Sequence, residues 1–158
     1  PVQVGSQYVV TTSYSGTAFS SEVVDGNPAN PQIDLPLNIY ESGDDPANIQ
    51  IDGLLTMVQA RTQPDQLEIV QIYSFTNVSD RVFMKADSGT PTSVSVRLPQ
   101  GAAFEDLSRG NYLVSADGTQ VTDTQPVLPG NAHVMHLAFT MPYSSSASIE
   151  RRSIGRPA

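Results

Sequence analysis

Cysteine and tryptophan are absent from the sequence, lysine occurs once, and only 15% of the residues are charged. Without cysteine the chain can form no disulfide, thiolate nucleophile or cysteine-held metal centre. Without tryptophan it lacks the largest aromatic face for stacking against a sugar. No apolar run approaches the ~18 residues that a membrane-spanning helix needs. Disulfide-stapled scaffolds, thiol enzymes and cysteine-based metalloproteins are thereby excluded.

Positive charge is scarce as well. The sequence holds 8 basic and 16 acidic residues, and its formal net charge is −8. An acidic surface repels phosphate backbones, so we expect no nucleic-acid partner. Three of the basic residues, Arg151, Arg152 and Arg156, lie near the C-terminal end. Such a block is either a solvated end of the chain or a contact with an acidic neighbouring subunit.

Serine, threonine, asparagine, glutamine and valine take the place of the missing charges, and apolar residues alternate with polar ones in short segments. This composition disfavours helices and suits strands. The alternation predicts strands over residues 7–14, 17–24, 33–39, 49–57, 67–77, 81–85, 94–98, 111–115, 120–122 and 132–141. One helical turn is predicted at 104–107. No apolar stripe of helical period appears, so we predict an all-β fold, an antiparallel β-sandwich.

Three of these strands carry positional signals. Pro36 cannot donate to a ladder, which places strand 33–39 at a sheet edge. In strand 67–77, apolar residues lie on both faces, which is typical of a central strand covered on both sides. In strand 49–57, alternation predicts one shared face for a set of apolar residues: Ile49, Ile51, Gly53, Leu55 and Met57.

The first two strands predict an N-terminal hairpin, because only Ser15-Gly16 separates them. A lone hairpin is marginal in water, so it must pair with the main domain or with another subunit. We therefore predict a hairpin at 1–24 that can exchange strands, a sandwich domain at 25–143 and a flexible Ser/Arg-rich tail at 144–158. The candidate subunit contacts are Tyr8, Val10, Tyr14, Phe19, Val23, Arg151, Arg152 and Arg156.

No motif for catalysis emerges from the sequence. It has no nucleophile elbow, phosphate-binding glycine loop or paired-histidine zinc motif, and no cofactor is expected. His133 and His136 are three apart, so on one strand they point to opposite faces and cannot share a metal ion. Carboxylates for glycoside hydrolysis stay open as an alternative to simple surface acids, because their geometry is spatial. The nominal candidates are Asp65, Glu68, Glu105 and Asp106.

Acidic loops offer a weak case for calcium, which takes oxygen ligands. Asp44 and Asp45 lie in one loop, and Asp117 and Asp123 lie in or beside another. Their spacing matches no complete calcium-binding loop, and aspartate is what turns require in any case. Asn77-Val-Ser79 is a formal glycosylation sequon at a predicted turn, although such triplets also arise by chance.

A family resemblance runs through several of these segments. Residues 7–16 resemble the final strands of carboxypeptidase-regulatory-like (transthyretin-like) domains. Residues 68–83 are similar to a segment of bacterial membrane-anchored surface proteins, in which such a domain precedes a second β-sandwich, and the similarity continues over 94–101 and 127–143. The resemblance implies that the predicted sandwich is of immunoglobulin-like or transthyretin-like type. It also implies an exported protein, anchored to a membrane in its precursor, with no enzymatic residues to carry over. The start at Pro1, without methionine, fits a processed product.

These observations lead to one main hypothesis and two alternatives. The main hypothesis is a structural cell-surface protein that adds strands between subunits to form a homo-oligomer, filament or surface layer. The first alternative is a monomeric extracellular binding or adhesion module, for a sugar or a protein, or an accessory subunit of a membrane complex. The second alternative, an enzyme, is disfavoured by the absence of any catalytic motif.

Overall fold

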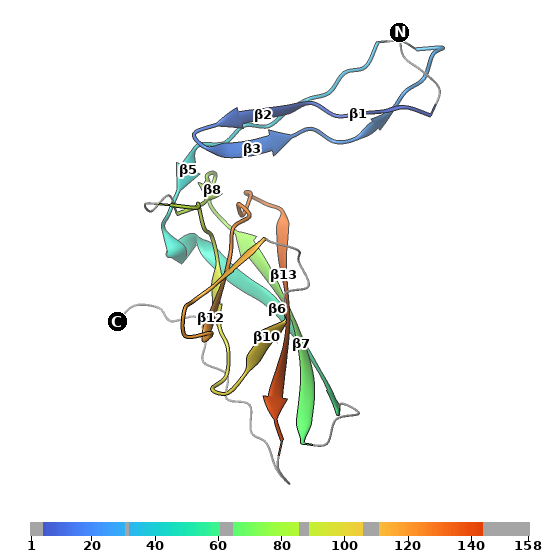
Figure 1. Ribbon diagram of the computed structural model, residues 1–158. Coiled ribbons are helices and arrows are strands. Elements are labelled where there is room, and N and C mark those ends of the chain that lie inside the picture. Colours follow the sequence, from blue (N-terminus) through green and yellow to red (C-terminus); the bar gives the residue numbers. More distant parts are fainter. Residues whose placement is uncertain (1–4, 31, 61–64, 86–88, 106–110, 144–158) are drawn as a thin grey trace. The chain divides into compact units, whose positions relative to one another are not determined.

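The computed structural model describes residues 5–30, 32–60, 65–85, 89–105 and 111–143 (Figure 1). These residues form strands in several antiparallel sheets, as predicted, and the one helical element among them is the short 3-10 helix η1 (Pro46–Asn48). The chain divides into two compact units, one ending at Ser42 and the other beginning at Gly43. Residues 25–42 thus belong with the N-terminal hairpin, and the boundary falls later than residue 24.

The N-terminal unit is built on the predicted hairpin. Strands β2 (Thr11–Tyr14) and β3 (Thr17–Ser20) are antiparallel, and β1 (Gln7–Tyr8) pairs with β4 (Val24–Asp25) further along the same ribbon. At the turn, Ser15 and Gly16 both have positive φ angles, 48° and 80°. Two positive φ values define the turn whose twist matches that of paired strands, so the hairpin prediction is confirmed.

The predicted edge strand at 33–39 joins no ladder in the described part of the chain and is not a strand. Its side chains still alternate, with Ile33, Leu35 and Leu37 half-buried between exposed neighbours. An extended backbone alternates its side chains whether or not it pairs, so the pattern alone could not show pairing. Close by, the rings of Phe19 and Tyr40 lie 6.3 Å apart.

The second unit holds the strands from β6 onward, and the two-residue strand β5 spans the boundary between the units. A four-stranded antiparallel sheet has the order β10-β13-β7-β6, and a three-stranded antiparallel sheet has the order β11-β12-β9. A short pair, β5 with β8, completes the set. The bounds are β5 (Ser42–Gly43), β6 (Ile49–Ala60), β7 (Gln66–Asn77), β8 (Val82–Phe83), β9 (Ser95–Arg97), β10 (Ala103–Glu105), β11 (Tyr112–Val114), β12 (Gln120–Asp123) and β13 (Ala132–Pro142).

The prediction of a helical turn at 104–107 was wrong for 104–105, the part of this range that the structure describes. Phe104 lies in β10 and pairs with Phe139 of β13, and both side chains point toward the core. The long-range pairing with β13 overrides the weak local preference, because burying an aromatic side chain stabilises the fold by ~1.5–3 kcal/mol.

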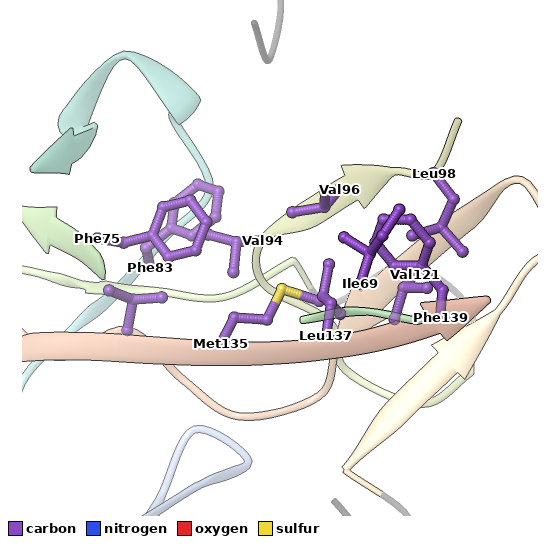
Figure 2. Packing of buried hydrophobic residues seen from close by; sticks show 11 residues of the cluster. Ile69, Phe75, Phe83, Val94, Val96, Leu98, Val121, Met135, Leu137 and Phe139 are labelled. Atoms are coloured by element: carbon purple, nitrogen blue, oxygen red, sulfur yellow. The ribbon is translucent and has the colours of Figure 1, made fainter. Parts of the chain in front are cut away.

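One hydrophobic core draws side chains from both sheets (Figure 2). The four-stranded sheet supplies the largest of them, including Phe75, Phe139 and Ile69, which are fully buried. The three-stranded sheet supplies Val96 and Val121. The loops and β8 complete the cluster with Phe83, Val94, Leu98 and Val127. Close packing here fixes the two sheets with respect to each other, and so fixes which strands are left at the edges.

Strand β7 is central, as predicted, because it pairs with β13 on one side and β6 on the other. It is not covered on both faces by the described residues. Its core face carries Ile69 and Phe75, which are buried, whereas Val70 and Ile72 on the outer face are only half-buried. The apolar residues of the outer face therefore remain partly open to solvent.

The shared face predicted for strand 49–57 was wrong. The β6–β7 register shifts between Ile51 and Gly53, which is a β-bulge at Asp52. Ile51 pairs with Phe75 on the core side, whereas Leu55 pairs with Ile72 on the outer side. A bulge inserts one extra residue and so reverses the alternation beyond it.

Candidate functional site

The longest sheet edge among the described strands is β6. It has 12 residues and pairs only with β7, on one of its two sides, within the described part of the chain. The other edge strands of the two main sheets, β9, β10 and β11, have three residues each. On the open side of β6, every second residue presents a backbone N–H and C=O that can pair with a further strand.

Little on β6 opposes such pairing. Folded proteins protect an edge with lysine, proline, a bulge or a very short strand. Strand β6 has the bulge near its start, but its only charged residue is Asp52, and it contains no proline. The stretch Gly53–Ala60 beyond the bulge carries no charge at all. Large apolar side chains are exposed there, with exposed fractions of 54% for Leu55, 45% for Met57 and 50% for Val58.

The outer face of β6 continues into an apolar strip across the sheet. The register places Leu55 beside Ile72, and Met57 beside Val70. Val70 in turn pairs with Ala138 of β13. Cross-strand apolar neighbours of this kind stabilise a sheet by ~0.2–1 kcal/mol per pair. A strand added at the open edge would extend the same strip.

The core face of β6 holds an unsatisfied polar group. The hydroxyl oxygen of Thr56 is buried and has no hydrogen-bond partner, the sole buried side-chain polar atom of this kind in the described residues. Thr56 faces Gln71, whose amide oxygen accepts a hydrogen bond from the Tyr73 hydroxyl at 3.2 Å. A buried polar group without a partner costs ~1–3 kcal/mol, so this hydroxyl is an energetic cost within the protomer.

The two histidines lie on opposite faces of β13, as their spacing predicted. His136 pairs with Ile72 on the outer face and is exposed, whereas His133 pairs with Phe75 on the core side. Nε2 of His133 lies 3.0 Å from Oδ2 of Asp123, which is buried on β12. The backbone N–H of Gln125 donates to the other carboxylate oxygen at 2.8 Å. This pair joins the two sheets and has a structural role.

The four calcium candidates do not come together. The described residues contain no group of three or more histidine, aspartate and glutamate side chains that could hold a metal ion. Asp45 caps η1 by accepting the N–H of Ala47 at 2.9 Å, and Asp123 is engaged with His133. Asp44 is exposed in its loop. Asp45 therefore caps a helix and Asp123 forms a buried contact between strands, and neither acts as part of a metal site within the described residues.

Asp117 organises the β11–β12 hairpin. Its carboxylate accepts hydrogen bonds from the Ser115 hydroxyl at 2.6 Å and from the N–H and hydroxyl of Thr119 at 3.1 and 2.8 Å. These bonds, the one from Ser115 foremost, lower the pKa of Asp117 from 3.8 to about 2. The carboxylate therefore contributes to stability above about pH 4, and this contribution is lost as the pH falls toward 2.

We expect a carboxyl NMR titration to place the Asp117 midpoint near pH 2. Ser115→Ala removes the strongest of the hydrogen bonds and should move the midpoint back toward 3.8, because hydrogen bonds to the charged form favour it. A midpoint near 3.8 in the unaltered protein would show that the turn does not hold the carboxylate in solution.

The Asn77 sequon is a structural feature of the fold. Asn77 is 1% exposed, and its amide nitrogen donates to the backbone oxygens of Arg81 and Val127 at 2.6 and 2.9 Å. Its amide oxygen accepts from the N–H and hydroxyl of Ser79. Because both amide hydrogens are used inside the fold, a glycan on this nitrogen is incompatible with the structure.

The other predicted residues have varied positions. In the N-terminal unit Val10, Tyr14 and Val23 are exposed and Tyr8 is half-buried, whereas Phe19 is buried and so is a core residue rather than a surface contact. The three tail arginines and Asp106 lie outside the described residues. Of the nominal glycosidase carboxylates, Glu68 and Glu105 lie on strands separated by β13, and Asp65 lies in the turn before β7.

Comparison with family models, curated proteins and solved structures finds no match to this chain. The resemblance to carboxypeptidase-regulatory-like surface proteins therefore stays a prediction from the sequence. Within the described residues no helix is long and apolar enough to cross a membrane. Sequence reasoning missed the open edge of β6, because an edge is defined by the lack of a pairing strand beside it.

Proposed function

We propose that this chain is a structural, non-catalytic protein that associates with copies of itself by adding strands at β6, and so builds a filament or layer at the cell surface. The proposal rests on β6, a 12-residue edge strand with one charged residue and several exposed apolar side chains. An edge of this kind is a template for a further strand. The two sheets around one core also favour the finer assignment of a β-sandwich.

A filament needs a second contact on each subunit, because a single two-fold contact closes at the dimer. The N-terminal unit is the candidate for this contact. It exposes Val9, Val10, Tyr14 and Val23, with exposed fractions between 42% and 59%. Its paired strands also have outer edges, so the predicted role of the hairpin in subunit contact remains part of the proposal.

The extracellular location rests on the sequence. The family that the sequence resembles consists of exported proteins. The chain has a low content of charged residues, and its negative net charge disfavours binding to nucleic acid. If the chain instead acts as a monomeric binding or adhesion module, the same β6 edge is the position at which an extended peptide of another protein would add. The oligomeric state separates these two functions.

Replacing Leu55 by lysine should abolish self-association. A lysine at the exposed edge places charge where the next strand must pack, while the monomer gains only a solvated side chain. Sedimentation velocity over a concentration series should show assembly of the unaltered protein and monomers of Leu55→Lys. Electron microscopy should show filaments or layers only for the unaltered protein.

Val78→Lys is the matched control, because Val78 has the same exposed fraction, 54%, but lies in the loop after β7. This variant should assemble like the unaltered protein. An unaltered protein that stays monomeric at high concentration would contradict the proposal and favour the monomeric module. Loss of assembly in both variants would point to a general effect of charge rather than to the β6 edge.

A further inference from the structure

We infer that β6 pairs with β6 of a second copy, antiparallel and related by a two-fold axis that passes at Thr56. This inference rests on the proposed function and specifies which strand is added. The partner is thus another copy of this chain, and its register follows from the side chains that β6 presents.

The distribution of charge on β6 is compatible with pairing between the β6 strands of two copies. In an antiparallel self-pair, residues near the middle of the strand face one another and residues near the ends lie far apart. Asp52 is the only charge on the strand and lies toward one end, at the bulge. The two Asp52 carboxylates are therefore well separated, and no like charges stand opposite each other, an arrangement that would be destabilising.

The apolar pattern selects the register. Directly opposite residues in an antiparallel pair lie on the same face of the sheet. Residues on one face of a strand are separated by an even number of positions. The two-fold axis therefore passes at a residue of β6 and not between two residues. With the axis at Thr56, Leu55 faces Met57 on the outer side and Leu54 faces Val58 on the core side. Apolar side chains then meet on both faces of the new pair.

The neighbouring registers lose these contacts. An axis at Leu55 places Met57 opposite Gly53 and Thr56 opposite Leu54. An axis at Met57 places Thr56 opposite Val58, and the exposed Leu55 then faces Gln59. In both cases the hydroxyl of Thr56 meets an aliphatic side chain, and one of the exposed apolar residues loses its apolar partner.

The buried hydroxyl of Thr56 supplies an independent argument for the same register. It has no hydrogen-bond partner in the described part of the protomer. With the axis at Thr56, the two threonines face each other with their Cβ atoms ~4.5–5.5 Å apart, within reach of a hydroxyl–hydroxyl hydrogen bond. The register that joins the apolar residues is thus also the one that gives this group a partner.

The N-terminal hairpin is a weaker candidate for the added strand. Its longest strands, β2 and β3, have four residues each and are already paired with one another. Strand β6 offers a longer uncharged edge. Two-fold pairing at β6, combined with a second contact through the N-terminal units, would alternate along an open-ended filament.

Cysteine cross-linking tests the register, and the absence of native cysteine makes single-cysteine variants unambiguous. Thr56→Cys places two thiols directly opposite across the pair, where the Cα separation of an antiparallel pair lies within the range of a disulfide. Under mild oxidation this variant should form covalent dimers at least about tenfold faster than Gln59→Cys, whose two thiols would lie ~20 Å apart along the strands. Non-reducing gels give the rates.

A mixture of Leu55→Cys and Met57→Cys keeps the Thr56 hydroxyl and provides a second measurement. Their mixed disulfide should exceed the homodimers of either variant, because these positions face each other in the inferred register. If the unaltered protein assembles but neither cross-link is favoured, this register is wrong, and the comparison of Leu55→Lys with Val78→Lys decides separately whether β6 is the assembling edge. If Gln59→Cys cross-links fastest, the register is likewise overturned. If the unaltered protein does not assemble, both the inference and the proposed function fail.

Discussion

Asn77→Asp should destabilise the protein severely, lowering the free energy of unfolding by about 3–5 kcal/mol, the range for an uncompensated buried charge. The side chain is fully buried, and its amide nitrogen donates to two backbone carbonyl oxygens, those of Arg81 and Val127. An aspartate of the same shape has no hydrogens to donate, so its negative oxygen would face both carbonyls without compensation. Urea unfolding, followed by circular dichroism because tryptophan is absent, measures the loss.

Asn131→Asp is the matched control for this substitution. Asn131 is exposed just before β13 in the same unit, so the same chemical change should shift stability by less than about 0.5 kcal/mol. Equal stabilities of the two variants would mean that the Asn77 amide is not held as the structure has it. Because typical domains are stable by only about 5–15 kcal/mol, Asn77→Asp is also expected to reduce the yield of folded protein.

Asp123→Ala should be the second large effect, with a loss of about 1–3 kcal/mol in the free energy of unfolding, the range for leaving a buried polar group without its hydrogen-bond partner. The carboxylate is buried and lies 3.0 Å from the His133 ring nitrogen, and it accepts the N–H of Gln125. Removing it leaves both groups without their acceptor and loosens the link between β12 and β13. Thermal and urea unfolding measure the change.

The double variant Asp123→Leu with His133→Leu distinguishes the contribution of the contact between the two side chains from the contribution of their packing. Replacing both partners by apolar residues leaves no polar side chain without its partner and can be neutral or stabilising. We expect the double variant to recover much of the stability that Asp123→Ala loses. If the double variant is as unstable as the single one, Asp123 stabilises the protein through packing or through the Gln125 contact rather than through its contact with His133.

Several elements were predictable because the signals for them are local. Alternation located β7 and β13 within one residue at each end, and Ser15-Gly16 identified the hairpin turn. These features depend on neighbouring residues alone, through side-chain alternation and the backbone freedom of the turn. The opposite faces of His133 and His136 followed from spacing in the same way.

Other features could not be predicted, because distant residues decide them. The bulge at Asp52 reversed the faces of β6, and it is defined only against β7. The alternating residues 33–39 found no ladder partner, and the predicted helical turn at Phe104 became a strand through pairing with β13. The acidic residues of the loops gave no sign of their partners, since Asp123 meets His133 only when two sheets pack together.

The sequence by itself determined that this protein is built of strands with a hairpin near its start, because alternation and turn chemistry act over a few residues. Only the tertiary structure decided that β6 is an open edge, that its outer face exposes Leu55 and Met57, and that the Thr56 hydroxyl is buried without a partner in the described residues. An edge exists only in relation to the other strands of its sheet, and that relation is set when the shared core forms.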